Sequence, residues 1–163
     1  MRSTRVGRST VLLGAVVAVA VIWSPVCQRR SEAAEPTAAQ KLCSRLWTEY
    51  TETVKAGDWE KTAARFSKDA VLIYPDMAEL RGRDAIRTHF QGFQGVRFLS
   101  MTFSLTHCAV VGEEAFTFAS ISEAYQQGSG PEMKESARCG VVWKRQADGN
   151  WLVSHFLVNH VKP

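Results

Sequence analysis

The histidine at position 155 is the residue of this sequence best suited to chemistry. It lies in the last apolar stretch of the chain, where strict alternation puts Val153, His155 and Leu157 on one face of a strand. Imidazole gains and loses a proton near neutral pH, so a histidine among apolar side chains is a candidate base. The same alternation puts no carboxylate on that face to orient the ring. A structural role for His155 is therefore the alternative.

Tyr50 is the second candidate for catalysis. A tyrosine hydroxyl in an apolar pocket can donate a hydrogen bond to the oxygen of a developing enolate. Aromatic and polar residues on the same predicted faces would line a site for a small apolar ligand. Ordinary core packing is the alternative for these aromatic residues. The predicted ligand-binding residues are Trp47, Tyr74, Phe90, His107, Ser120, Cys139, Trp143 and Asn159.

Helices and strands with clear apolar periodicity must position these residues. Leu42, Leu46 and Tyr50 recur every four residues, which predicts a helix from Lys41 that ends at Gly57. After Val96 the pattern alternates as in β-strands joined by glycine-containing turns. The simplest arrangement is an α+β domain in which the helices cover an antiparallel meander. The other predicted elements are helices at Trp59–Phe66 and Ala85–Phe93, and strands at Ala70–Tyr74, Phe98–Val111, Ala115–Gln126, Glu132–Arg145 and Trp151–His160.

The second face of the predicted sheet carries both apolar and charged residues. Such a mixed face is too apolar for free exposure, and it favours a homodimer in which two sheets pack together. Glu123 and Arg138 would pair across neighbouring strands there. The predicted interface comprises Ile121, Glu123, Arg138, Val142, Phe156 and Val158.

The first 33 residues have the pattern of an export signal. Arg2, Arg5 and Arg8 precede the apolar run Val11–Trp23, which is shorter than the roughly 20 residues of a spanning helix. Small residues allow cleavage after Ala33. We expect a signal at 1–33, a flexible lead-in at 34–40 and one domain at 41–163, in a periplasmic or secreted protein. An uncleaved N-terminal membrane anchor is the alternative.

Charge and motifs exclude several classes of function. Five of the 20 basic residues fall within the first 33 positions, which leaves a neutral domain with no basic surface for nucleic acid. The four cysteines form no C-x-x-C or metal-ligand cluster, so they are interpreted as small buried hydrophobic residues. No phosphate loop, G-x-S-x-G or H-E-x-x-H motif is present, and no cofactor is expected.

Short motifs in order along the chain resemble the nuclear-transport-factor-2-like superfamily. The resemblance extends from about Gln40 to Pro163 and is similar to the SnoaL-like and SgcJ/EcaC-type groups, and to the association domain of calcium/calmodulin-dependent protein kinase II. It implies a cystatin-like cone: three N-terminal helices on a strongly curved antiparallel sheet, with a pocket between them. The motifs are Tyr50-x6-Gly57-Asp58, Asp69-Ala70-Val71, Gly82-Arg-Asp-Ala-Ile86, Gly112-Glu-Glu-Ala115 and Asp148-Gly-Asn-Trp151.

The resemblance leaves three functions open, because this superfamily mixes enzymes, binding modules and scaffolds. Relative to ketosteroid isomerases, Tyr50 matches the oxyanion tyrosine, but Tyr74 and Val141 stand where the resemblance implies two acids. The first hypothesis is therefore a dimer that binds a small apolar molecule without assignable catalysis. The alternatives are a pocket enzyme that uses His155 and Tyr50 on a hydrophobic substrate, and an oligomerisation module.

Overall fold

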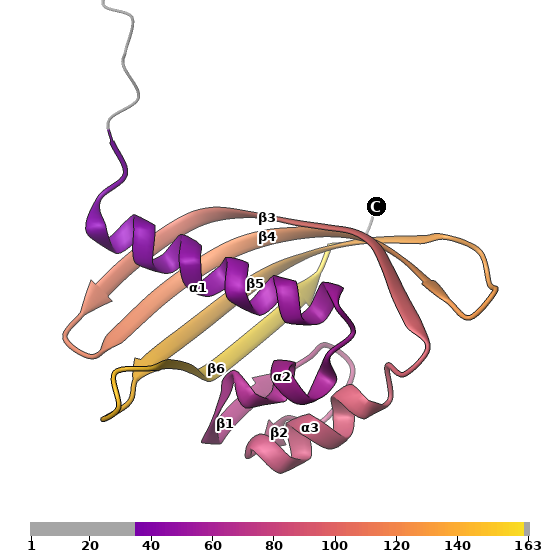
Figure 1. The fold of residues 1–163 in the computed structure, drawn as a ribbon, viewed down its shortest axis with the longest axis horizontal. Coiled ribbons are helices and arrows are strands. Elements are labelled where there is room, and N and C mark those ends of the chain that lie inside the picture. Colours follow the sequence, from indigo (N-terminus) through magenta and orange to yellow (C-terminus); the bar gives the residue numbers. More distant parts are fainter. Residues whose placement is uncertain (1–34, 162–163) are drawn as a thin grey trace, which may run out of the picture. The chain divides into compact units, whose positions relative to one another are not determined.

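Three helices and six strands make up residues 35–161, the part of the chain that this computed structural model describes (Figure 1). The predicted export signal lies outside these residues. None of the described helices combines the length and apolar character needed to cross a membrane. The elements are α1 (Ala38–Lys55), α2 (Trp59–Ala64), β1 (Phe66–Ile73), β2 (Leu80–Arg81), α3 (Arg83–Gln91), β3 (Val96–Val111), β4 (Glu114–Gln127), β5 (Met133–Arg145) and β6 (Trp151–His160).

The first helix starts within the segment predicted to be a flexible lead-in. A capping box explains the start at Ala38: the Gln40 amide donates to Thr37 Oγ1 at 3.2 Å, and the Thr37 amide donates to Gln40 Oε1 at 2.8 Å. The face predicted from the four-residue repeat is confirmed, since Leu46, Tyr50 and Val54 are buried.

The sheet contains two strands more than the predicted meander. Strands β3 to β6 pair antiparallel in chain order, as predicted, and the full order is β2-β1-β6-β5-β4-β3. β1 runs parallel to β6 and begins at Phe66, which the sequence pattern assigned to a helix. Phe66 is fully buried beside Val153 of β6, so a long-range contact overrides the local helical pattern. The predicted α+β class, with helices against a curved, mainly antiparallel sheet, is confirmed.

A bulge in β6 reverses the faces predicted for the end of the chain. Val142 pairs with His155, whereas Trp143 pairs with Val153, so Ser154 is an extra residue in the ladder. Its hydroxyl donates to the Val142 carbonyl at 3.1 Å. Beyond the bulge, His155 is exposed and Phe156 is buried. The predicted placement of His155 in the pocket is therefore wrong.

A second bulge, at Thr106 of β3, turns His107 outward. On β4 Ser120 was predicted to face the cavity but is exposed, because the small residues Ala115, Thr117 and Ala119 face the helices. They leave room for large side chains from other elements, above all Trp47 of α1. The prediction of this face missed β4 by one residue, the error to which strand register is most prone.

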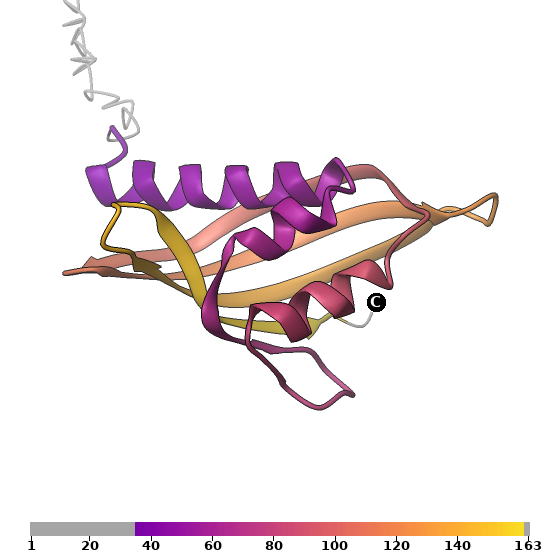
Figure 2. The same ribbon diagram turned by 60° about the horizontal axis from the view of Figure 1, so that its bottom comes forward.

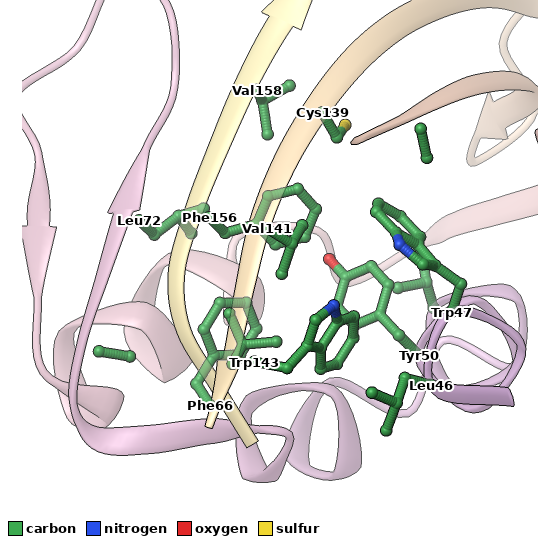
Figure 3. Close-up of a cluster of buried hydrophobic side chains, with 14 of the residues drawn as sticks. Leu46, Trp47, Tyr50, Phe66, Leu72, Cys139, Val141, Trp143, Phe156 and Val158 are labelled. Atoms are coloured by element: carbon green, nitrogen blue, oxygen red, sulfur yellow. The ribbon is translucent and has the colours of Figure 1, made fainter. Parts of the chain in front are cut away.

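The core between α1 and the sheet is built around two buried indoles (Figure 3). Trp47 of α1 and Trp143 of β5 meet edge to face, with ring centroids 6.2 Å apart. Both Nε1 atoms donate to the Thr117 hydroxyl, each at 3.0 Å. The same hydroxyl donates to the Val141 carbonyl at 3.3 Å, so one threonine satisfies two buried donors.

A disulfide joins α1 to β3, which corrects the prediction for two cysteines. Cys43 and Cys108 are bonded with their Cα atoms 6.3 Å apart and 65 residues apart in sequence. Interpreting them as small hydrophobic residues was wrong, because spacing alone does not reveal a pair that tertiary packing brings together. Cys139 is a buried free thiol, as predicted.

Candidate functional site

A cavity of about 370 Å³ opens between the helices and the concave face of the sheet. Figure 2 shows α1 above the curved strands β3 to β5, with α3 below them in this view and in front of β6. The volume falls in the range typical of small-molecule sites. Aromatic rings make up much of its wall, including Trp59, Phe90, Phe93, Phe98 and Phe156.

Two carboxylates face this cavity from neighbouring strands. Glu123 of β4 and Glu135 of β5 are directly opposite each other in the ladder. Like charges in this arrangement repel. Burial, together with the charge of Glu135, raises the pKa of Glu123 to about 7. Glu123 therefore exchanges a proton near neutral pH, which an ordinary surface glutamate does not.

Glu135 has partners that stabilise its ionised form, whereas Glu123 has none among the described residues. The Tyr125 hydroxyl donates to Glu135 Oε1 at 2.7 Å, and His160 Nδ1 lies 3.7 Å from Glu135 Oε2. Burial and this contact with Glu135 raise the pKa of Tyr125 to about 12, so its hydroxyl keeps its proton. The two carboxylates thus differ: Glu135 accepts a hydrogen bond from Tyr125, whereas Glu123 has no such partner among the described residues and has a raised pKa.

Further polar groups reach the cavity from α1, α3 and the residue after β1. Tyr50 extends from α1 toward the strands that carry Val141 and Phe156 (Figure 3). Burial is the main cause that raises the pKa of Tyr50 and of Tyr74, so both hydroxyls are neutral. His89 packs against Tyr74 with ring centroids 5.3 Å apart, and burial lowers the pKa of His89. The Nε2 atom of His89 is buried without a hydrogen-bond partner.

The structure brings some of the predicted site residues together and separates others. Tyr50, Tyr74, Phe90 and Cys139 line the cavity. Burial raises the pKa of Cys139 to about 12, so its thiol is no nucleophile at neutral pH. The predicted positions of the remaining residues are wrong: Trp47 and Trp143 lie in the core outside the cavity lining, and His107, Ser120, His155 and Asn159 are exposed.

The predicted dimer residues divide in the same way. Arg138 and Val142 lie on the outer face of the sheet, as the interface requires. The placement of the other four is wrong, because the shift on β4 and the bulge in β6 turn them toward the helices. They all line the cavity: Ile121, Glu123, Phe156 and Val158.

Sequence reasoning missed the carboxylate pair, although one signal for it was present. Glu123 and Glu135 stand at equal distances on either side of Ser129, the centre of the turn between β4 and β5. A hairpin centred there must put them opposite each other. The one-residue error on β4 assigned Glu123 to the outer face instead. His160 was missed because of the bulge in β6.

A second hollow, of about 390 Å³, lies between α1, α2 and the turn before β6. Its charged side chains are already paired: Glu49 accepts from Arg45 at 2.9 Å and from Arg65 at 2.6 Å. Within residues 35–161, no group of three or more potential ligands is arranged to hold a metal ion. The cavity with the carboxylate pair is therefore the candidate site.

Comparisons with known proteins agree with this architecture. Similar structures include a ketosteroid isomerase-like protein from Erwinia carotovora atroseptica (TM-score 0.66, 16% identity, covering 74% of this chain and 94% of that one). A scytalone dehydratase-like protein from Novosphingobium aromaticivorans has a TM-score of 0.63 at 16% identity, covering 75% and 83% of the two chains. ActVI-ORFA from Streptomyces coelicolor has a TM-score of 0.62 at 16% identity, covering 76% and 98%.

Sequence comparison gives the family directly. No curated protein matches the chain in sequence. The family model of the SnoaL-like domain, however, matches residues 47–154, which is more than half of the chain and includes both cavity carboxylates. The chain therefore belongs to the SnoaL-like family, within the nuclear-transport-factor-2-like superfamily.

Proposed function

We propose that this protein is an acid–base enzyme that acts on a small, largely apolar molecule bound in the cavity. The observation that carries the proposal is Glu123, which faces the cavity opposite Glu135 with a pKa of about 7. A carboxylate with such a pKa is well matched to accept and return a proton at neutral pH. An isomerase-like and a dehydratase-like protein among the structural neighbours support this class of chemistry.

The cavity residues divide the work of a proton transfer. The Glu123 carboxylate removes a proton from a substrate carbon next to a carbonyl group, and the electron pair moves onto the carbonyl oxygen. The neutral Tyr50 hydroxyl donates a hydrogen bond to that oxygen. The electron pair on the oxygen then re-forms the carbonyl, and protonated Glu123 returns the proton either to another carbon or to a hydroxyl group whose C–O bond breaks to release water. Glu135 accepts a hydrogen bond from Tyr125 beside the reacting Glu123.

Proton abstraction can be measured with 5-nitrobenzisoxazole, a neutral bicyclic compound. A base that removes its ring C–H proton breaks the N–O bond and releases a coloured phenolate with a nitrile group. We expect kcat/KM to rise with pH through about 7, where Glu123 ionises. In Glu123→Gln, kcat/KM should fall by about 100-fold or more.

Glu132→Gln is the matched control, since Glu132 lies outside the cavity lining beside Lys134. The pH dependence of folding stability gives a second control, because the pKa of Glu123 is raised in the folded protein. The folded state holds the Glu123 proton more tightly than the unfolded state, so wild-type stability falls as the pH rises from 4.5 past 7. Glu123→Gln should therefore be more stable than the wild type near pH 9 but not near pH 4. Equal kcat/KM values in wild type and Glu123→Gln would show that Glu123 is not the base, and the cavity would then be a binding site without this catalysis.

We also propose that the protein is a homodimer that pairs the outer faces of its sheets. Exposed apolar residues form a row across the ladder: Phe118 is opposite Gly140, Gly140 is opposite Leu157, and Leu157 is beside Ile73. Phe118, Leu157 and Ile73 are 55%, 49% and 38% exposed, and the exposure of neighbouring apolar side chains to water is unfavourable. In a two-fold symmetric dimer, the row of one copy packs against the same row of the second copy.

Light scattering tests the dimer through the row. Wild type should have the mass of two chains, and Phe118→Asp should have the mass of one, because the interface would bury an unpaired charge. Val111→Asp is the control, since Val111 is 67% exposed at the end of β3, outside the row. A monomeric wild type, or a dimeric Phe118→Asp variant, would contradict the proposed interface.

Export remains a proposal, with the segment before Ala34 acting as a signal. The Cys43–Cys108 disulfide supports it, because structural disulfides persist in oxidising compartments. N-terminal sequencing of protein from its host should then find a chain that begins at Ala34.

A further inference from the structure

The charges of the cavity are all of one sign. Its described lining contains Glu123 and Glu135 but no lysine or arginine. The other titratable groups there are neutral tyrosines, a protonated thiol and two histidines, of which His160 lies at the outer end. A bound carboxylate or phosphate would meet two like charges without a compensating guanidinium. The cavity is therefore unsuited to anions.

Glu123 has no cation beside it, in contrast to several other glutamates of the fold. Glu49, Glu60 and Glu79 each contact an arginine. Glu123 makes no ion pair or hydrogen bond with any described residue, although it is opposite a second carboxylate. Such an arrangement costs stability, and a cation between the two side chains would remove that cost.

A second, independent group points into the same space. The Tyr50 side chain is 95% buried, lines the cavity, and its hydroxyl makes no hydrogen bond with any described residue. A hydrogen-bonding ligand atom in the cavity would supply the partner that this hydroxyl lacks among the described residues. A hydroxyl oxygen can accept an N–H as well as donate its own proton.

The aromatic wall suits the same kind of ligand. Trp59 stacks on Phe90 with ring centroids 6.2 Å apart and lies 6.2 Å from Phe98. Aromatic faces attract organic cations, and they also bury the apolar body of a ligand. Aromatic rings together with carboxylates are a combination that recognises ammonium groups on apolar molecules.

We propose that the cavity binds an apolar amine, with its ammonium group between Glu123 and Glu135 and one N–H directed at the Tyr50 hydroxyl. This inference rests on the proposed function and names the substrate class of the same site. The ammonium pairs with Glu135, whose carboxylate also accepts a hydrogen bond from Tyr125 and lies 3.7 Å from His160 Nδ1. Glu123 is left as the group that moves the proton.

The bound ammonium also changes the protonation of Glu123. A neighbouring positive charge favours the carboxylate, so binding lowers the pKa of Glu123 from about 7. Near pH 7 about half of the free protein carries the Glu123 proton, and that proton is released when the amine binds. The substrate thereby converts Glu123 to its basic form. Glu123 also has titratable neighbours in Tyr50, Tyr74, Tyr125 and Cys139, which keep their protons at this pH because burial raises their pKa values.

Calorimetry with three matched probes tests the charge preference. They are 2-(1-naphthyl)ethylamine, the neutral 2-(1-naphthyl)ethanol and the anionic 1-naphthylacetate, which share one apolar body. The amine should bind about 10-fold or more tightly than the alcohol, and the acetate more weakly than either. Titrations near pH 7 in buffers of different ionisation enthalpy should show release of about half a proton with the amine and none with the alcohol.

Variants assign the effect to the carboxylates. Glu123→Gln should lose the proton release, Glu135→Gln should lose most of the preference for the amine, and Glu132→Gln should retain both. Equal affinity for amine and alcohol, tighter binding of the acetate, or no binding of any of the three would overturn the inference. Proton abstraction from the neutral 5-nitrobenzisoxazole does not depend on a cationic ligand. A failed amine-binding test therefore leaves the proposed catalysis standing, and a failed catalysis test leaves the amine preference standing.

Discussion

A Thr117→Val variant should lose about 2–6 kcal/mol of unfolding free energy, because two buried indole N–H groups would each lose their acceptor. Trp47 and Trp143 both donate to the Thr117 hydroxyl at 3.0 Å, and Thr117 is 1% exposed. Valine has nearly the shape of threonine, so the variant leaves the packing in place and removes the polar atom. An unsatisfied buried donor typically costs about 1–3 kcal/mol, and here there are two.

Urea unfolding of Thr117→Val and Thr117→Ser measures this cost. Serine keeps the hydroxyl and loses a methyl group, for which we expect about 1 kcal/mol. The valine variant should therefore unfold at much lower urea than the serine variant, with a similar slope. If serine were as damaging as valine, the methyl group and not the hydroxyl would support this core.

The same threonine shows why one face of the sheet was mispredicted. Large apolar residues normally indicate the core, but Phe118 of β4 is 55% exposed. Here α1 lies so close that β4 presents Ala115, Thr117 and Ala119, and the volume is filled by Trp47 from the helix. Such an exchange of volume between distant segments is not visible in the alternation of one strand.

Helix faces, turns and the order of β3 to β6 were predictable, because each follows from local periodicity and glycine placement. Residues Leu46, Tyr50 and Val54 of α1 face the core as predicted. The candidate site was not predictable to the same degree, since one extra residue in a strand exchanges its two faces. At Ser154 that exchange moves His155 out and brings Phe156 and Val158 in. The proposed chemistry rests on Glu123, which the sequence pattern assigned to a dimer surface.

Loss of the Cys43–Cys108 disulfide should cost about 4 kcal/mol of unfolding free energy, from a loop closure of 65 residues. The bond joins the first helix to β3, so its removal lets the unfolded chain explore many more conformations. Stabilities of small domains are about 5–15 kcal/mol, and the loss is a large part of that. Paired cysteines at this separation leave no local signal, which is why the sequence interpretation missed them.

Urea unfolding with and without a thiol reductant separates this bond from other effects. The Cys43→Ala/Cys108→Ala double variant should match the reduced wild type and show no response to reductant. Its slope should be larger than that of the oxidised wild type, because the unbridged unfolded chain exposes more surface. Cys139→Ala is the control: Cys139 is a free thiol, so this variant must keep the full response to reductant. An oxidised wild type that is no more stable than the reduced one would show that the bond does not constrain the unfolded chain as the loop-closure argument requires.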